Sequence, residues 1–265
     1  MTFHNGIKIA VSGKGGVGKT TLSAMLCHLY AGEGKRVLAV DADPDANLGM
    51  ALGFTPQELE QGTTIAQDRK LIKERTGAEP GSSGQWFSLN PKVDDIPQKY
   101  VLQKSGVKLL QLGVTSTGGS GCYCPENSFI KHLLNHLVLE EKDTVIVDME
   151  AGLEHMSRGT ARSVDAFLVV VEPGQRSFQT ARATVKLARD LGVERVFAVV
   201  NKVREGQEQA IKEALDFMPL LGMLPYQPEA VLADLYGKTV FETCPSLVAR
   251  GKEIKERLEQ QLQHA

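Results

Sequence analysis

The chain has 265 residues and a formal net charge of −2, with 42% hydrophobic and 23% charged residues. This length can bury a core that covers well over half of the unfolded surface, so the chain is large enough for an enzyme domain. The near-neutral charge gives no general attraction to nucleic acid, and no apolar stretch approaches the roughly 20 residues that span a bilayer. Because we also read no signal peptide at the beginning of the sequence, we expect a cytoplasmic protein with neither nucleic acid nor a membrane as its partner.

Short β-rich runs alternate with helical patterns along the chain. Runs such as Ala166–Val171 are apolar throughout, which is typical of strands in a parallel sheet that helices cover on both faces. We therefore predict an α/β fold with a doubly wound, mainly parallel sheet, in one domain that spans residues 1–265. The predicted strands are Ile7–Val11, Arg36–Asp41, Val107–Leu112, Thr144–Met149, Ala166–Val171, Val196–Asn201 and Leu221–Pro225. The predicted helices are Lys19–Gly32, Asn127–Leu139, Ser177–Leu191, Glu208–Phe217 and Leu247–Gln261.

A glycine-rich run lies directly between the first predicted strand and the first predicted helix. It matches the phosphate-binding pattern G-x-x-x-x-G-K-[ST] in the strand-then-helix context that this pattern requires. Its backbone N–H groups can turn toward phosphates, and the helix that begins at Lys19 adds the positive end of its dipole. We expect Lys19 to reach the β- and γ-phosphates and the Thr20 hydroxyl to hold Mg²⁺. The run consists of Gly13, Lys14, Gly15, Gly16, Val17, Gly18, Lys19, Thr20 and Thr21.

Lys14 is a second lysine in this loop. The loop needs only Lys19 for its own nucleotide, so Lys14 either bonds elsewhere or is a solvated loop residue. The run Lys14–Thr21 resembles the deviant Walker A motif of the superfamily that contains the nitrogenase iron protein and the septum-site and chromosome-partition ATPases. The resemblance implies a P-loop NTPase in which Lys14 crosses a nucleotide-bridged homodimer and stabilises charge on the partner's phosphates during hydrolysis.

Acidic residues follow the second predicted strand, at Asp41, Asp43 and Asp45. Alternation along a strand sends Asp41 and Asp43 to the same side. In the superfamily the Asp before this Pro orients or activates water, so the resemblance assigns Asp43 that catalytic role and, through water, a place near Mg²⁺. A turn or capping role for the acidic cluster is the alternative, because Asp and Pro are ordinary turn residues.

Two segments depart from the alternation of strands and helices. Residues 76–100 are rich in Gly, Ser, Pro, Asp and Asn and contain the only Trp, so we expect a long surface insertion there. Residues 118–126 contain Cys122 and Cys124 among glycines, which indicates an accessible turn where two thiolates converge. Two thiolates are half of a four-coordinate site, and a two-fold dimer would supply four, which suits Zn²⁺ or Ni²⁺. A pair of free or redox-active cysteines is the alternative.

Three histidines lie near these motifs. His132 and His136 are four residues apart on the helix that is predicted after the cysteines, so they can face one way as metal ligands do. The alternative is that they only flank the buried stripe of that helix. His155 lies in the segment after Asp148, which we interpret below as the second switch. It is either a coupling residue or a packing residue there.

The run Val145–Asp148 is a predicted strand that ends in an acid, as a Walker B element does. We expect Asp148 to bind Mg²⁺ through water. The small residue Gly152 would let the second switch approach the γ-phosphate closely. Glu150 stands where the superfamily often has Pro, which gives this switch an unusual charge.

Base recognition is predicted at the ends of the last two strands. Asn201 resembles the strand-terminal Asn that reads the adenine amino group in the superfamily, since an amide can donate and accept together. A plain turn Asn is the alternative. Lys202 follows, but Arg204 stands where the guanine signature Asn-Lys-x-Asp needs an acid, so ATP is favoured over GTP. Pro225 and Tyr226 lie where the family packs backbone against the base.

Five further segments carry a closer resemblance, and the second and third of them together are more specific than the phosphate loop: Asp41–Leu48, Leu89–Pro97, Gly119–Glu126, Asp148–His155 and Arg158–Thr160. They resemble the CooC-type accessory ATPases that mature nickel carbon monoxide dehydrogenase, and the resemblance runs over almost the whole chain. It implies a nucleotide- and metal-promoted homodimer that hydrolyses ATP to ADP and phosphate. It also implies that Cys122 and Cys124 of both subunits hold Ni²⁺ or Zn²⁺, and that nickel is delivered into the Ni–Fe–S centre of the client dehydrogenase.

Two other functions belong to the same superfamily. A partition or positioning ATPase would bind DNA or membrane, and the near-neutral charge and the plain C-terminal helix argue against both. A redox protein like the nitrogenase iron component would hold an Fe–S cluster across the dimer. That arrangement uses one cysteine from each of two separated positions per chain, whereas only one residue separates Cys122 from Cys124.

Overall fold

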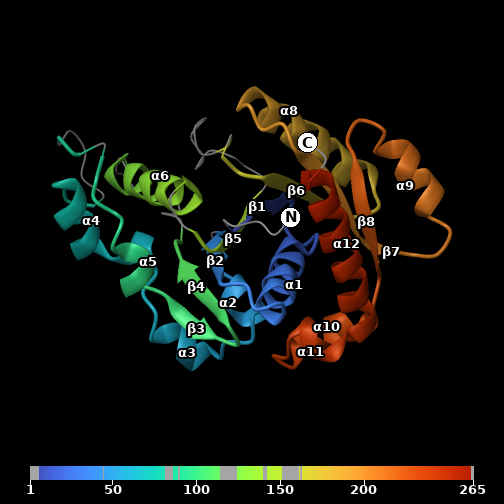
Figure 1. Cartoon of the computed structure of the whole chain (residues 1–265), viewed down its shortest axis with the longest axis horizontal. Coiled ribbons are helices and arrows are strands. Elements are labelled where there is room, and N and C mark those ends of the chain that lie inside the picture. Colours follow the sequence, from blue (N-terminus) through green and yellow to red (C-terminus); the bar gives the residue numbers. More distant parts are fainter. Residues whose placement is uncertain are drawn as a thin grey trace.

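The computed structural model describes residues 6–43, 45–80, 86–88, 90–113, 124–139, 142–150, 161 and 163–263. These residues build an eight-stranded sheet in the order β3-β4-β2-β5-β1-β6-β7-β8. Neighbouring strands are parallel except β3 and β4, which are antiparallel. Helices cover both faces of the sheet (Figure 1). The predicted α/β fold with a doubly wound, mainly parallel sheet is confirmed.

The strands and helices have the following bounds. The strands are β1 Lys8–Gly13, β2 Val37–Ala42, β3 Leu102–Lys104, β4 Val107–Gln111, β5 Thr144–Met149, β6 Ala166–Val171, β7 Val196–Val203 and β8 Leu220–Pro225. The helices are α1 Lys19–Gly32, α2 Leu48–Ala51, α3 Pro56–Glu60, η1 Ile65–Gln67, α4 Arg69–Thr76, α5 Ile96–Lys99, α6 Cys124–Leu139, α8 Gln175–Asp190, α9 Glu208–Ala214, α10 Pro228–Leu235, α11 Val240–Thr243 and α12 Pro245–Gln263. Within the described ranges, none of these helices has the length and apolar character that crossing a bilayer needs.

Two hydrophobic cores lie on opposite faces of the sheet. One packs Phe129 of α6 and Phe178 of α8 against the strands, and the other packs Leu26 of α1 and Leu258 of α12. Because both faces are covered, every residue of β1, β5 and β6 is buried. This explains the continuous apolar runs in the sequence.

The helix α12 packs directly on α1. Gly251 of α12 lies so close to Met25 of α1 that a Cβ there would overlap the methionine sulfur. The Lys255 side chain is only 2% exposed, and its ammonium lies 2.9 Å from the Glu33 carboxylate and 3.0 Å from that of Glu259. The close contact and the paired, buried charge fix α12 against α1.

The sequence predicts the bounds of α1, β5 and β6 correctly and misplaces others. The helix expected to begin at Asn127 begins at Cys124 instead, and Pro125 suits its first turn. The three-residue strand β3 was not predicted, because it is too short to show alternation. It pairs with β4 through a turn at Ser105 and Gly106, whose φ values are 49° and 78°.

The segment 76–100 combines exposed and buried parts. Trp86 is 97% exposed, as expected for a surface insertion. Val93 and Ile96, however, are 3% and 0% exposed and belong to the same core as α6. In the described parts of this segment, therefore, the chain also helps to close one face of the sheet.

Candidate functional site

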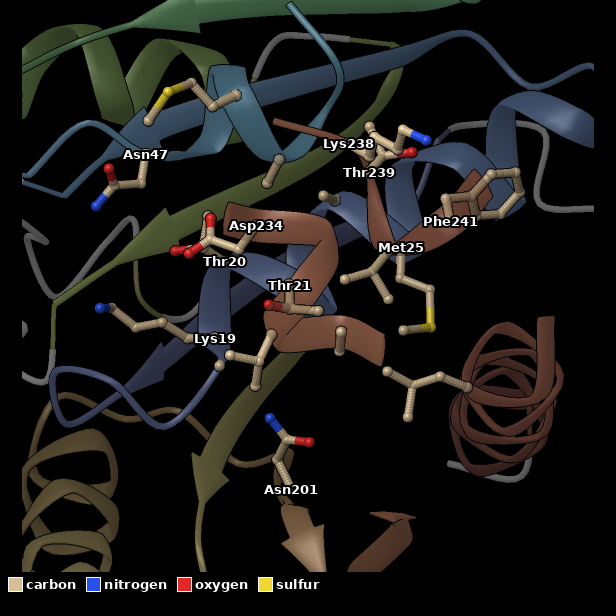
Figure 2. A pocket seen from close by; sticks show the side chains of 18 of the residues that line it. Lys19, Thr20, Thr21, Met25, Asn47, Asn201, Asp234, Lys238, Thr239 and Phe241 are labelled. Carbon is tan, nitrogen blue, oxygen red and sulfur yellow. The ribbon is translucent and has the colours of Figure 1, made fainter. Parts of the chain in front are cut away.

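The carboxyl ends of β1, β2 and β5 meet at one edge of the sheet. The chain places β5 on one side of β1 and β6 on the other, and such a change of direction opens a ligand-binding crevice in doubly wound folds. The strand register sets Asp41 of β2 beside Asp148 of β5. A cleft of about 660 Å³ opens here, with the phosphate loop and the start of α1 in its wall (Figure 2).

The phosphate loop needs its glycines because of its backbone and its neighbours. Gly16 and Gly18 have φ values of 80° and 94°, which strain any residue with a side chain. A Cβ at Gly13 would lie 2.5 Å from the Val170 carbonyl oxygen, and one at Gly18 would overlap the Asn201 amide. Contacts with β6 and β7 therefore fix the shape of the loop.

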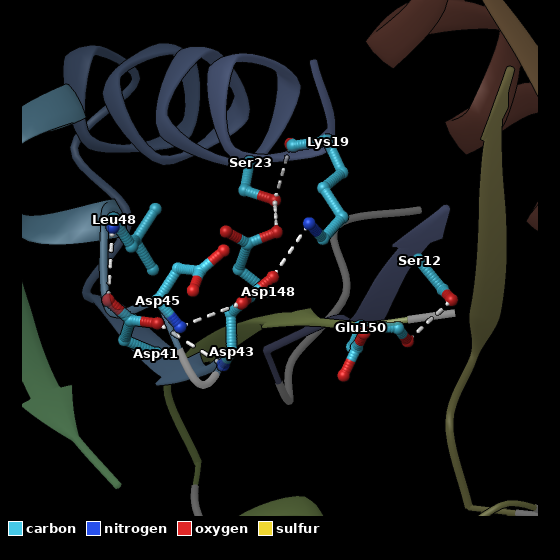
Figure 3. Close-up of polar contacts among 9 residues, drawn as sticks. All are labelled: Ser12, Lys19, Ser23, Asp41, Asp43, Asp45, Leu48, Asp148 and Glu150. Carbon is cyan, nitrogen blue, oxygen red and sulfur yellow. Dashed lines mark hydrogen bonds and ion pairs between the residues drawn. The ribbon is translucent and has the colours of Figure 1, made fainter. Parts of the chain in front are cut away.

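Lys19 and Asp43, which both line the cleft, form a buried ion pair (Figure 3). The Lys19 ammonium lies 2.6 Å from the Asp43 Oδ2 atom, and both side chains are less than 10% exposed. The other carboxylate oxygen of Asp43 accepts a hydrogen bond of 3.0 Å from the Asp45 backbone N–H. The structure thus brings together the two residues that the sequence assigned to the phosphates and to water.

Asp148 is fully buried at the carboxyl end of β5. Its Oδ1 atom lies 3.1 Å from the Ser23 hydroxyl of α1, whereas its Oδ2 atom has no hydrogen-bond partner within the described residues. Burial raises the pKa of Asp148 to about 6, although Thr20, Lys19 and Ser23 partly offset this shift. A buried, unpartnered carboxylate oxygen beside the Thr20 hydroxyl fits Mg²⁺, which prefers such hard oxygen ligands.

Asp41 holds the turn that carries Asp43. Its Oδ2 atom accepts a hydrogen bond of 3.0 Å from the Leu48 N–H, and its Oδ1 atom accepts one of 3.3 Å from the Asp43 N–H. Burial raises the pKa of Asp41 to about 7, and the negative charge of Asp148 adds to this shift. Asp41 therefore has the turn-stabilising role that was the alternative for this acidic cluster, while Asp43 faces Lys19.

Lys14 differs from Lys19 in its surroundings. Its side chain is exposed and makes no hydrogen bond or ion pair with any residue that the structure describes. Because the Lys14 ammonium has no partner among the described residues, it can meet an anion outside its own chain. The second switch, including Gly152 and His155, lies outside the described residues.

Asn201 and Lys202 support the phosphate loop from the end of β7. The Asn201 side-chain amide donates a hydrogen bond of 2.9 Å to the Val17 carbonyl, and its oxygen accepts one of 2.9 Å from the Lys202 N–H. The Lys202 ammonium donates to the Gly16 carbonyl at 2.6 Å and lies 3.3 Å from Glu172. Asn201 also lines the cleft, so its place does not exclude the predicted contact with adenine.

The cleft has a wall that sequence reasoning missed. Pro225 and Tyr226 were predicted near the base and line the cleft, but the chain after them also contributes Asp234 and Lys238 from the region of α10. The ring of Tyr226 lies 5.1 Å from the Arg204 guanidinium and is held by it. The only signal for these residues in the sequence was their place after the last predicted strand.

The metal-binding motif is only partly within the described residues. Cys122 lies outside them, and Cys124 is placed by its backbone as the first residue of α6. No group of three or more His, Cys, Asp or Glu residues gathers in a metal-binding arrangement elsewhere in the described ranges. His132 and His136 lie on α6, and burial together with the nearby His136 lowers the pKa of His132.

Comparisons with known proteins agree with this geometry. The family model for the CobQ/CobB/MinD/ParA nucleotide binding domain matches residues 8–240. The carbon monoxide dehydrogenase accessory protein CooC of Rhodospirillum rubrum is 43% identical over 241 residues, which are 91% of each chain. An uncharacterised ATP-binding protein of Methanocaldococcus jannaschii is 39% identical over 237 residues, which cover 88% of this chain and 91% of the relative.

Solved structures share the fold at low sequence identity. The cell division ATPase MinD of Pyrococcus furiosus superposes with a TM-score of 0.66 at 20% identity, covering 97% of this chain and 99% of that chain. MinD of Aquifex aeolicus, in a complex with MinC, gives the same TM-score and identity over 96% of each chain. The chain therefore belongs to the CobQ/CobB/MinD/ParA family of nucleotide-binding domains, and within it is similar to the CooC accessory proteins.

Proposed function

We propose that this protein is an ATP-hydrolysing metallochaperone that delivers nickel into the Ni–Fe–S centre of a carbon monoxide dehydrogenase. The observation that carries the proposal is the 43% identity to CooC over 91% of both chains. The phosphate loop and its buried acids support the ATPase part of the activity. The adjacent Cys122 and Cys124 support the metal part. A reducing cytoplasm, in which thiols stay free, is the compartment that suits this chemistry.

The cleft has the groups that ATP hydrolysis needs. Lys19 and the loop N–H groups would hold the phosphates, and Thr20, Asp148 and, through water, Asp43 would hold Mg²⁺, which neutralises phosphate charge. In the structure, the Asp43 carboxylate lies 2.6 Å from the Lys19 ammonium and neutralises its charge. A phosphate that binds Lys19 competes with this ion pair and releases the Asp43 carboxylate to orient water. Nucleotide binding and release of the Asp43 carboxylate then occur in the same step.

Lys14 and the thiolates are proposed to act between two copies of the chain. The exposed Lys14 ammonium would reach the partner's phosphates, so the dimer forms on ATP. Cys122 and Cys124 of two chains would supply the four sulfurs of one Ni²⁺ or Zn²⁺ site. The helix α6, which begins at Cys124, leads toward β5 and Asp148, so that one continuous stretch of chain joins the metal and nucleotide sites.

Asn201, Lys202 and Pro225 are proposed to bound the nucleoside end of the cleft. One N–H of the Asn201 amide is committed to the Val17 carbonyl, which leaves a second N–H and an oxygen lone pair for adenine. The partition and Fe–S alternatives lack a comparable observation, because the MinD structures are 20% identical to this chain and support the fold alone.

The test is to measure bound metal and oligomeric mass together, with and without ATP. We expect one Ni²⁺ or Zn²⁺ per dimer and a dimer that ATP and metal both promote. Cys122→Ser and Cys124→Ser should remove this thiolate-bound metal and leave nucleotide binding in the monomer. Cys244→Ala is the matched control, since Cys244 is buried and does not line the cleft. A dimer that forms on ATP with no thiolate-bound metal, or brown protein with Fe–S absorption, would contradict the proposal.

A further inference from the structure

The helix α6 has a row of polar residues beside its hydrophobic face. Cys124, Ser128, His132 and His136 follow one another at intervals of four residues. Residues four apart on a helix lie one above the other, so these positions form a single ridge. The residues of α6 that pack into the core are Phe129, Ile130, Leu133, Leu134, Leu137 and Val138.

The two histidines of this row lie near each other on α6 and have no other partner in the described ranges. Both side chains are half-buried at the border of the hydrophobic face, which limits the positions that they can take. Neither imidazole makes a hydrogen bond or an ion pair with any residue in the described ranges. Packing explains the burial of the helix face, but it does not explain two adjacent imidazoles whose nitrogens have no partner among the residues that the structure describes.

We propose that His132 and His136 together bind one borderline divalent transition-metal ion, of the Ni²⁺ or Zn²⁺ class, through their ring nitrogens. Two histidines one turn apart on one helix face are the arrangement by which helical histidine pairs hold Zn²⁺. Imidazole is a ligand that suits both Ni²⁺ and Zn²⁺. Two protein ligands leave the remaining coordination positions to water or to a donor from another molecule, so the ion is exchangeable.

The histidine site is separate from the cysteines. Eight residues of helix separate Cys124 from His132, which is about 12 Å at 1.5 Å per residue, too far for one ion to be shared. An ion released by thiolates at the start of α6 would therefore meet the imidazoles as its next protein ligands. Only this transfer rests on the proposed function. Metal binding by the pair rests on α6 alone and needs neither nucleotide nor dimer.

The test uses Ni²⁺ and the full-length chain without a histidine tag. In the Cys122→Ser and Cys124→Ser double variant, without nucleotide, calorimetric titration should find one Ni²⁺ per chain. Adding His132→Gln or His136→Gln should weaken binding about tenfold or more, because a two-point attachment becomes a one-point attachment. Lys131→Gln, on the exposed side of the same helix, is the matched control and should leave Ni²⁺ affinity unchanged.

X-ray absorption at the nickel edge gives a second readout that needs no change at His132 or His136. The double cysteine variant should show two imidazole ligands on nickel, even if a histidine variant fails to fold. Absence of bound Ni²⁺ in that variant, or unchanged affinity in both histidine variants, would overturn the inference. Failure of the proposed function would look different: ATP hydrolysis or the thiolate-bound metal of the unaltered chain would be missing while Ni²⁺ on the imidazoles remained.

Discussion

At the scale of single residues, the site is organised by competition for Lys19. Its ammonium is neutralised by Asp43 at 2.6 Å inside the protein, and phosphates require the same ammonium. Asp41 fixes the turn, so that Asp43 has a defined place when Lys19 leaves it. Under the proposed function, Asp43 opposes nucleotide binding before it assists hydrolysis.

Replacing Asp43 by Asn separates these two roles. Asp43→Asn removes the charge that competes for Lys19, so ATP affinity should be unchanged or higher. Turnover should fall by about 10²-fold or more, because the attacking water loses its orienting carboxylate. The measurements are ATP affinity by calorimetry and phosphate release under saturating ATP. Asp45→Asn, at an exposed neighbour, is the control. A loss of ATP affinity that equals the loss of turnover would assign Asp43 to binding instead of chemistry.

At the scale of elements, β7 and the phosphate loop form one unit. Asn201 and Lys202 hold the carbonyls of Val17 and Gly16, and Gly18 admits the Asn201 amide where a Cβ would overlap it. A strand that is about 180 residues further along the chain therefore fixes the shape of the loop. A change at Asn201 therefore affects the phosphate loop through its contact with Val17.

The variant Asn201→Ala distinguishes support of the loop from recognition of the base. Loss of the hydrogen bond to Val17 should weaken binding of tripolyphosphate, which has no base, by about threefold to tenfold. Binding of ADP should weaken further, because the contact with adenine is also lost. Calorimetric titration of both ligands measures the two effects. Unchanged binding of tripolyphosphate would exclude the supporting role, and equal losses for both ligands would exclude the contact with adenine.

The sequence predicts those parts of the fold and site that depend on local pattern. Buried parallel strands show as apolar runs, and the phosphate loop shows as a fixed motif, so Lys19 and Asp148 were found. Contacts between distant segments have no local signal, which is why the Lys19–Asp43 pair and the Asn201–Val17 bond could not be predicted. The short strand β3 and the cleft wall near α10 were missed because neither contains a periodic pattern.

At the scale of the whole molecule, two buried acids lower the stability of the fold as the pH rises. Asp41 and Asp148 are neighbours in the sheet, both fully buried, with pKa values raised to about 7 and about 6. The folded protein therefore retains protons that the unfolded chain has already released above pH ~4. Because the folded state binds more protons in this window, the contribution of these groups to stability falls as the pH rises from about 4 to about 7.

Removing one of these charges should stabilise the nucleotide-free protein at high pH. Asp148→Asn should raise the free energy of unfolding at pH 8 by on the order of 1–2 kcal/mol, and by much less at pH 5, where the wild-type group is largely protonated. Urea unfolding in magnesium-free buffer at both pH values measures this difference. Asp45→Asn should show no such dependence. An equal effect of Asp148→Asn at both pH values, or destabilisation at pH 8, would contradict the assignment.

The packing of α12 on α1 has a consequence for synthesis of the protein. The strand β1 and the helix α1 leave the ribosome before the segments that they contact, because β1 lies between β5 and β6 and α1 is covered by α12. The phosphate loop therefore stays without its supporting strands until β7 has been made, and α1 stays uncovered until residues 247–262 follow. Partial chains that end before β7 or α12 therefore lack the contacts that shape the phosphate loop and cover α1.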